Sequence, residues 1–263
     1  MRLPLFAVDD VIKRALNEDI SYLDTTTDYL IEEDAMGDAY LLAKAQGVLC
    51  GLEIAMRVFS LIDPAFTFQA QKQDGDRVEK GERTALNLLQ HLSGIATATA
   101  QAVELVAGTG ATIVDTRKTL PGLRSLQKYA VTMGGGRNHR YNLSDAAMLK
   151  DNHIDAGGGI TAAIGKLRGR VGHMVNIEVE TRNLDEVREA LAAGADIIML
   201  DNMDCGTMRE AVRINEGRAV LEASGGITAA TLRAVAETGV DIISIGALTH
   251  SVQAFDISMK YGR

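Results

Sequence analysis

The sequence predicts an α/β protein, in which a small α+β region precedes a small or open barrel of parallel strands. From residue 111 onward, short aliphatic runs alternate with amphipathic helical stretches, the pattern of parallel βα units. The strand-like runs number six, too few for a complete eight-stranded barrel, so a doubly wound sheet is the alternative. These runs cover residues 111–115, 146–150, 175–180, 196–200, 219–223 and 241–246.

The helical stretches between these runs end at glycines. Residues 184–194 and 227–239 carry apolar side chains at helical spacing, and each stretch closes on a glycine. Glycine is the residue that most often follows a helix. These glycine ends therefore support separate helices between the predicted strands.

The region before residue 80 mixes short helices and strands. Apolar residues at helical spacing predict a helix over 9–16, and residues 38–49 indicate two strands separated by a glycine. A second helix over 52–62 is ended by a proline. Apolar alternation predicts a half-buried strand over 66–70, and residues 74–76 form a turn signal. Together these elements describe a small α+β unit.

A long helix predicted over 82–106 bridges the two regions. Gly94 is expected to interrupt it, because glycine lowers helix stability relative to alanine. We therefore expect an N-terminal domain at residues 1–110 and a catalytic barrel domain at 111–250. A tail at 251–263 is expected to return to the N-terminal domain.

Composition excludes several classes of protein. Hydrophobic residues make up 46% and charged residues 24% of the 263 residues, which is typical of a folded globular chain. No apolar run approaches the length of a membrane span. A net charge of -8 and the absence of tryptophan disfavour nucleic-acid binding. The two cysteines cannot form a disulfide framework, so a reducing cytoplasm is expected.

Chemically capable residues follow every predicted strand. In a parallel barrel the carboxyl ends of the strands open on one face, where barrel enzymes keep their active sites. The strand-end groups are Asp115-Thr116-Arg117-Lys118, Lys150-Asp151-Asn152-His153, Glu178 with Glu180, Asp201-Asn202, Ser224-Gly225-Gly226 and Gly246-Ala247.

The last two strand ends indicate a phosphate site. Glycines directly after a strand let backbone N–H groups approach an anion, and the next helix N-terminus adds positive charge. Barrel phosphate sites are frequently built from the final two loops, here Ser224–Gly226 and Gly246. A single loop of this kind would be read as a short turn, but two consecutive ones favour phosphate binding.

A group of basic residues suggests a pocket for an anionic small molecule. Local clustering of basic residues in an otherwise acidic protein indicates a binding site for a small anion, not a nucleic-acid surface. The planar guanidinium group of arginine matches the geometry of carboxylate or phosphate. A solvated, ion-paired face is the alternative, preferred for Arg124 and Arg137. The basic group comprises Arg83, Arg117, Lys118, Arg137, His139, Arg140, Lys150 and His153.

Two carboxylates form the opposite pole of the expected site. Glu180 and Asp201 stand at neighbouring strand ends and suit ribose hydroxyls or a Mg²⁺ ion. Glu178 alone is interpreted as a capping or ion-pairing residue. Cys205 follows a strand end, but no histidine stands at a revealing distance, so it is not interpreted as a nucleophile.

Residues 115–154 carry the most specific motifs, DTRK, NHR and LKDNHI. With ERTALN at 82–87, EVE at 178–180, and IGALTHS at 245–251, nearly the whole chain resembles the quinolinate phosphoribosyltransferase family, also called nicotinate-nucleotide pyrophosphorylase (carboxylating). The resemblance implies an N-terminal α+β sandwich domain and an incomplete, open α/β barrel. It also implies a homodimer or higher homo-oligomer with shared active sites.

The resemblance further implies a reaction of de novo NAD biosynthesis. Members of the family condense quinolinate with 5-phosphoribosyl-1-pyrophosphate, with Mg²⁺, giving nicotinate mononucleotide, CO2 and pyrophosphate. Catalytic roles are implied for Lys118, Lys150, Glu180 and Asp201, the last two facing ribose and metal, and Arg83 is expected to reach the partner's site. The implied substrate-binding residues are Arg83, Thr116, Arg117, Lys118, His139, Arg140, Lys150, Glu180, Asp201, Ser224, Gly225, Gly226, Gly246 and Ala247.

One departure from the family pattern concerns the N-terminal domain. The family usually carries a strand-rich segment before ERTALN, whereas here Lys80-Gly81 leads directly into Glu82-Arg83. Either the sandwich is trimmed or residues are missing from the sequence, which affects the placement of Arg83. Alternative functions are a paralogue associated with molybdenum transport, a non-catalytic nucleotide-sensing homologue, and a nicotinate-using transferase that does not decarboxylate.

Overall fold

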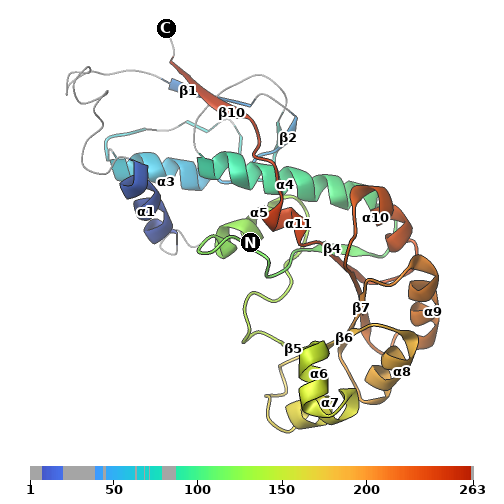
Figure 1. Ribbon diagram of the computed structural model, residues 1–263. Helices are drawn as coiled ribbons and strands as arrows, with labels where there is room; N and C mark the ends of the chain where they lie inside the picture. The colour runs from blue at the N-terminus through green and yellow to red at the C-terminus, as the bar shows by residue number, and fades with distance from the viewer. Residues whose placement is uncertain are drawn as a thin grey trace. The chain divides into compact units, whose positions relative to one another are not determined.

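The computed structural model describes residues 8–19, 39–43, 46–62, 64–67, 69–70, 72–78 and 87–261 (Figure 1). Its elements fall into two compact units. One comprises Met1–Ala98, Thr119–Gly135 and Ser251–Arg263, and the other Thr99–Lys118 and Gly136–His250. The predicted domain boundaries at 110 and 250 stay a prediction. Among the described helices, none has the length and apolarity to span a membrane.

The second unit is built on a parallel sheet. All six predicted strands are confirmed, in the order β4-β9-β8-β7-β6-β5, and every neighbouring pair is parallel. The consecutive strands β4 and β5 stand at the two edges of that order, so the sheet is a barrel opened between its first two strands. In a doubly wound sheet the order of the strands along the sheet reverses at a central strand. The observed order has no such reversal among the strands β5 to β9, so that alternative is wrong. The strands are β4 (Thr112–Val114), β5 (Ala147–Leu149), β6 (Ile177–Thr181), β7 (Ile197–Asp201), β8 (Val220–Ser224) and β9 (Ile242–Ser244).

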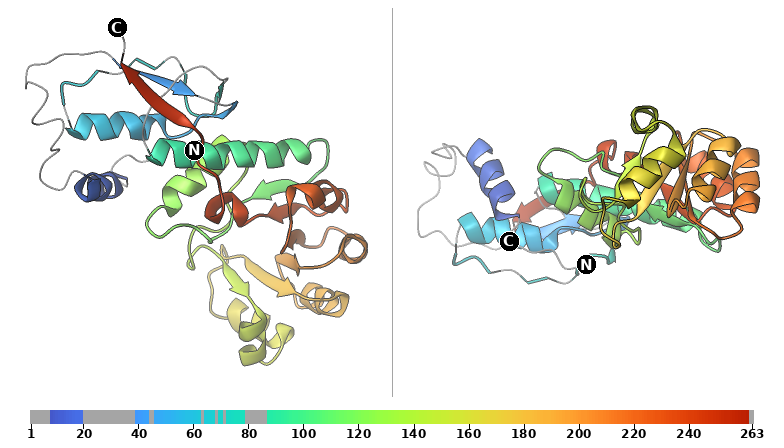
Figure 2. Two further views of the ribbon diagram at one scale, coloured as in Figure 1. Left: turned by 45° about the horizontal axis from the view of Figure 1, so that its top comes forward. Right: turned by 90° about the horizontal axis from the view of Figure 1, so that it is seen from below.

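Helices connect successive strands of this sheet. In both views of Figure 2, α8, α9 and α10 lie along one side of the sheet. Side chains of Asn183 and Asp204 accept backbone N–H groups at the starts of α8 and α9, as N-caps do. Gly194 and Gly239 take positive φ values after α8 and α10. The helices are α6 (Asp151–Gly157), α7 (Ile160–Arg168), α8 (Leu184–Ala192), α9 (Cys205–Asn215), α10 (Ala229–Ala236) and α11 (Ala247–His250).

The side chains of strand β6 alternate between the two faces of the sheet. Ile177, Val179 and Thr181 alternate with Glu178 and Glu180 along the strand, and successive side chains of a strand point to opposite faces. The two glutamates therefore share the face opposite to that of Ile177, Val179 and Thr181. That alternation places carboxylates on one side of a sheet whose other side packs on helices.

The first unit combines short antiparallel pairs with helices. Strand β10 pairs with β1, so the end of the chain returns to the N-terminal region (Figure 1), and β2 pairs with β3. An Asp74 carboxylate accepts the N–H groups of Gly51 and Leu52 at 2.9 and 2.8 Å, at the start of α3. The elements are α1 (Asp9–Asp19), β1 (Ala39–Ala43), β2 (Gly47–Val48), α3 (Leu52–Ile62), β3 (Arg77–Val78), α5 (Arg124–Met133) and β10 (Ile257–Tyr261), together with the part of α4 (Asn87–Leu105) up to Ala98.

Two sequence predictions in this region are wrong. No strand forms among the described residues of 66–70, where Phe66 and Ala70 are exposed, and Phe68 lies outside the described part. Phe66 instead stacks on Phe59 with ring centroids 4.6 Å apart. Stacking on a helix side chain gives the aromatic ring a packing partner without a strand. Alternation of apolar and polar residues over so short a segment was therefore not sufficient to predict a strand.

The other correction concerns Gly94. Helix α4 runs through it without interruption. A Cβ atom at this position would collide with the carbonyl of Gln253 and lie 3.3 Å from the nitrogen of Phe255. Glycine therefore serves the close approach of the C-terminal segment to the helix, and it does not break the helix.

Candidate active site

The parallel pairing of all six strands brings their carboxyl ends to one edge of the sheet. The prediction that the polar strand ends share one side is thereby confirmed, because parallel strands all end in the same direction. The contacts between neighbouring strand ends show how the individual groups are held.

The loop after β4 lies against the loop after β9. The Thr116 hydroxyl accepts the Lys118 N–H at 3.0 Å, and the Lys118 carbonyl accepts the Thr249 hydroxyl at 2.7 Å. Lys118 Cδ would stand 3.1 Å from a Cβ atom on Gly246. The lysine stem thus passes beside the glycine that the sequence assigns to phosphate.

The loops after β7 and β8 interlock. Asn202 donates its backbone N–H to Ser224 at 2.9 Å and its side-chain amide to Asp201 at 2.8 Å. Asn202 has a positive φ of 53°, and Gly225 and Gly226 have φ values of 93° and 61°. A Cβ atom on Gly225 would lie 2.5 Å from Asn202 Cγ, so glycine is sterically required there. Asp201 and the glycine turn are therefore held by one asparagine.

Lys150 and Glu180 meet across the ends of β5 and β6. The ammonium donates to a Glu180 carboxylate oxygen at 2.6 Å, with side-chain exposures of 49% and 17%. Exposed ion pairs of this kind contribute little to stability. Both groups therefore remain within reach of a ligand that approaches this edge.

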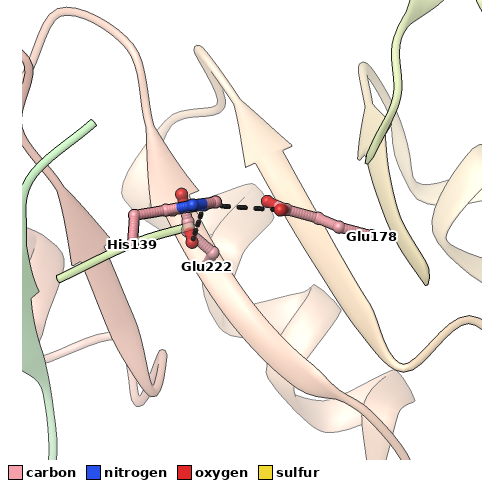
Figure 3. Close-up of side chains that lie close together, drawn as sticks. All are labelled: His139, Glu178 and Glu222. Atoms are coloured by element: carbon pink, nitrogen blue, oxygen red, sulfur yellow. Dashed lines mark ion pairs between the residues drawn. The ribbon is translucent and has the colours of Figure 1, made fainter. Parts of the chain in front are cut away.

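Three buried side chains form a separate cluster, shown in Figure 3. The Nε2 atom of His139 lies 3.3 Å from an oxygen of Glu178 and 3.3 Å from an oxygen of Glu222. The glutamates come from β6 and β8 and are each 1% exposed. Alternate strands contribute side chains to one layer of a barrel interior, which explains why these two carboxylates converge.

The cluster binds protons tightly. Burial would lower the pKa of His139, but the carboxylates of Glu178 and Glu222 outweigh it, so the three groups together keep an additional proton up to a pKa of about 10. Burial, with the neighbouring charge of Glu222, also raises the pKa of Glu178, against the lowering effect of His139. Ionising both carboxylates in a low-dielectric site costs free energy, because the two negative charges repel each other. The cluster therefore retains a proton at neutral pH.

The position of the ring proton follows from the second ring nitrogen. His139 Nδ1 accepts the backbone N–H of Arg140 at 2.7 Å, so this nitrogen presents a lone pair and the ring proton is on Nε2. The additional proton belongs on the carboxylate pair, because a second ring proton would face the Arg140 N–H.

That tautomer does not suit a metal ion. The donor atoms of His139, Glu178 and Glu222 lie within 4.8 Å of one another, a spacing that could accommodate a cation. A metal on Nε2 would need the lone pair there and would move the ring proton to Nδ1, against the Arg140 N–H. The cluster is therefore a hydrogen-bonded one.

Arg140 is held beside a second arginine. Its Nη1 donates to the Ala146 carbonyl at 2.9 Å and its Nη2 contacts Met148 Sδ at 3.5 Å. Burial and the nearby charge of Arg117 both lower the pKa of Arg140, while Glu178 and Asp145 oppose them. Two guanidinium groups at close range form a site for an anion.

Asp115 fixes the segment that precedes Arg140. It is fully buried and accepts the side-chain N–H of Asn138 at 2.6 Å and the backbone N–H of His139 at 2.9 Å. Arg137 is exposed, as the alternative reading of a solvated face expects, and its backbone bridges to Val114. Arg83 lies outside the described residues.

Sequence reasoning missed Glu222 and assigned Glu178 an ordinary ion-pairing role. The signal was present: each glutamate is flanked on both sides by apolar residues within its strand run, NIEVE and VLEAS. A charged residue in such a run is rarely buried without a partner. Only the fold shows that these two glutamates share one histidine.

Comparison with known proteins identifies the family. The family model for the C-terminal domain of quinolinate phosphoribosyl transferase matches residues 95–260, and the model for its N-terminal domain matches residues 24–93. The chain belongs to the quinolinate phosphoribosyl transferase family. The predicted family resemblance and the predicted fold class, an N-terminal α+β domain with an open α/β barrel, are both confirmed.

Relatives within the quinolinate phosphoribosyl transferase family match most of the chain. It is 46% identical to a probable nicotinate-nucleotide pyrophosphorylase (carboxylating) of Bacillus subtilis, covering 94% of this chain and 92% of the relative. A Synechocystis protein of the same name is 44% identical over 279 aligned residues, covering 99% and 94%. That alignment is longer than the 263-residue chain, so the relative has residues without counterparts here.

Solved structures agree with the family assignment. The crystal structure of NadC from Streptococcus pyogenes superimposes with a TM-score of 0.94 at 41% identity, covering 100% of both chains. Similarity at this level extends over both domains of the family.

Proposed function

We propose that the protein transfers the phosphoribosyl group of 5-phosphoribosyl-1-pyrophosphate to quinolinate, with decarboxylation. The products are nicotinate mononucleotide, CO2 and pyrophosphate, a step of de novo NAD biosynthesis. The observation that carries the proposal is the match to both domain models of the family. The strand-end edge supports it with the group types that the substrates require: guanidinium groups, carboxylates and glycine turns.

Quinolinate carries two carboxylates, which fit the paired arginines. In the proposal, Arg117 and Arg140 bind the substrate carboxylates, because two neighbouring guanidinium groups match two carboxylates in charge and geometry. Fixing the pyridine ring in this way orients its nitrogen towards C1 of the ribose. Such positioning can supply several kcal/mol of the barrel enzyme's rate enhancement, up to about 7–11 kcal/mol in favourable cases.

The phosphoribosyl donor is assigned to the opposite part of the edge. The turn at Ser224–Gly226 and the loop at Gly246-Ala247 would hold the 5-phosphate through backbone N–H groups. Thr116 closes the neighbouring loop after β4, and Lys118 and Lys150 would stabilise the departing pyrophosphate.

Glu180 and Asp201 are assigned to the ribose and the metal. Their carboxylate oxygens are the ligand type that Mg²⁺ prefers, and both stand at strand ends of the same sheet edge. Mg²⁺, when bound with the substrate, would neutralise charge on pyrophosphate. The two carboxylates would also favour the positive charge that develops on the sugar.

The bond changes in the proposed reaction balance without a covalent enzyme intermediate. The C1–oxygen bond to pyrophosphate breaks as the bond from C1 to the ring nitrogen forms. The alkylated, cationic nitrogen then stabilises the electron pair left at the adjacent ring carbon when its carboxylate leaves as CO2. A proton from water completes that carbon.

Assembly and location remain part of the proposal. We propose a cytoplasmic homodimer or higher oligomer in which Arg83 of one subunit completes the site of the other. Mixing an Arg83→Ala variant with a Lys150→Ala variant should restore activity, because some mixed dimers then contain one intact site. Absence of restoration in verified mixed dimers would show that each subunit is self-contained.

One assay tests the reaction. The protein is incubated with 5-phosphoribosyl-1-pyrophosphate, Mg²⁺ and either quinolinate or nicotinate, and CO2 and mononucleotide are measured. Mononucleotide and CO2 in equal amounts, from quinolinate only, are expected. Product from nicotinate without CO2 would indicate the non-decarboxylating transferase. Binding without turnover would indicate a sensing homologue, and no activity with either substrate would favour the molybdenum-associated paralogue.

A further inference from the structure

Two buried glutamates have no role in the assignments above. Glu178 and Glu222 are each 1% exposed, so neither can reach a substrate at the strand-end edge without a large rearrangement. One oxygen of each carboxylate is buried with no hydrogen-bond partner among the described residues. Burying such groups costs free energy, so their presence calls for an internal function.

Both glutamates converge on His139. Each carboxylate has one oxygen 3.3 Å from Nε2, and Figure 3 shows the edge of the ring directed between the two carboxylates. The carboxylates favour the tautomer with its proton on Nε2, because only that tautomer donates to them. Nδ1 is then left with a lone pair.

The other side of the ring holds Arg140. Nδ1 accepts the Arg140 backbone N–H at 2.7 Å, and the backbone N–H of His139 is bound to Asp115 at 2.9 Å. The guanidinium of Arg140 is held separately by the Ala146 carbonyl at 2.9 Å. A continuous set of bonds therefore runs from the barrel interior, through one imidazole, to the backbone of the arginine assigned to quinolinate.

Electrostatics act in the same direction as these bonds. Burial and Arg117 make the charged form of Arg140 less favourable, whereas Glu178 favours it. Glu178 thus helps to orient the segment and, together with Asp145, offsets the repulsion between the two guanidinium groups.

We propose that Glu178 and Glu222 are positioning residues that act through His139 to fix the backbone of Arg140, and so its quinolinate-binding guanidinium. His139, expected from the resemblance to contact substrate, would in addition position Arg140. This inference rests on the proposed function, since it concerns how that site binds quinolinate. A direct metal ligand role for the cluster is disfavoured by the same tautomer.

The first test separates positioning from general stability. Glu178→Gln and Glu222→Gln keep the side-chain size but remove the charge. The KM for quinolinate is expected to rise about 10-fold to 100-fold, the effect of a small misplacement, while the KM for 5-phosphoribosyl-1-pyrophosphate changes less than about twofold. Asn215→Ala is the matched control, because Asn215 is also buried and hydrogen-bonded, to Ala219, and should lower stability without changing either KM.

The second test asks whether the effect passes through Arg140. In an Arg140→Ala background, Glu222→Gln should add less than about twofold to the KM for quinolinate, because residues that act as a unit are non-additive. Fully multiplicative effects would overturn the proposal. So would an unchanged quinolinate KM in both glutamine variants alongside a large increase in His139→Asn, which would make His139 a direct ligand.

A third measurement observes the protonation of His139 in the wild-type protein directly. A ¹H–¹⁵N spectrum of histidine side chains, with His139 assigned by its loss in His139→Gln, should show a proton on Nε2 and none on Nδ1. A proton on Nδ1, or a transition metal found in stoichiometric amount by elemental analysis of the purified protein, would refute the arrangement. Wild-type turnover is measured first, so failure of the proposed function and failure of this inference are distinguished.

Discussion

Replacing Gly225 by alanine should damage the site through a single neighbouring side chain. Gly225 has a φ of +93°, and a Cβ atom there would lie 2.5 Å from Asn202 Cγ. An L-residue in a left-handed conformation costs about 1–2 kcal/mol. Forcing an extra methyl into occupied space costs about 1–3 kcal/mol more. We expect Gly225→Ala to lower the free energy of unfolding by about 2–5 kcal/mol.

Gly217→Ala provides the matched control. Gly217 also has a positive φ, +74°, but nothing lies within 4 Å of its would-be Cβ atom. This variant should lose only the backbone part, about 1–2 kcal/mol. Urea unfolding of both variants measures the difference, which isolates the contact with Asn202. Equal destabilisation of the two variants would refute the reasoning.

The same substitution should affect catalysis. Displacing the Asn202 side chain breaks its 2.8 Å hydrogen bond to Asp201 and distorts the turn assigned to phosphate. The kcat/KM for 5-phosphoribosyl-1-pyrophosphate should therefore fall by about tenfold or more, corresponding to about 1.4 kcal/mol. Adding Asn202→Gly to Gly225→Ala should recover the steric part of the stability loss but not the catalytic loss.

Three further predictions concern the ion-binding edge, the buried cluster and the helix α4. Lys150→Ala and Arg117→Ala should each reduce turnover by orders of magnitude with the circular dichroism spectrum unchanged; near-normal turnover would contradict their roles. The free energy of unfolding should decrease as pH rises from 6.5 to about 10, since the folded cluster around His139 keeps a proton that an unfolded histidine releases near 6.5. Glu222→Gln should flatten that slope, and an equal slope would exclude the cluster as its source. Gly94→Ala should destabilise by about 1–3 kcal/mol, because its methyl meets the backbone of Gln253; a stabilising effect would show that helix propensity dominates.

Local pattern determined much of the barrel. The alternation of aliphatic runs with amphipathic stretches was sufficient to locate all six strands, because strand and helix periods differ and each run packs on one face. The polar residues at strand ends could be placed together in advance for a similar reason. Parallel strands bring their carboxyl ends to one edge whatever the details of packing.

Contacts between segments far apart in the sequence were decided only by the tertiary structure. Gly94 reads as a helix breaker until the segment around Gln253 is seen against it. Phe66 reads as a strand residue until its ring is seen stacked on Phe59.

The buried cluster is the clearest case of such a decision. Glu178 and Glu222 stand on strands separated in the sheet by β7, and the histidine between them comes from a loop. Neither spacing nor composition reports that convergence, because burial and mutual distance belong to the folded chain. The sequence by itself determines which groups are available at the site, and only the packing of the barrel decides which of them hold the others in place.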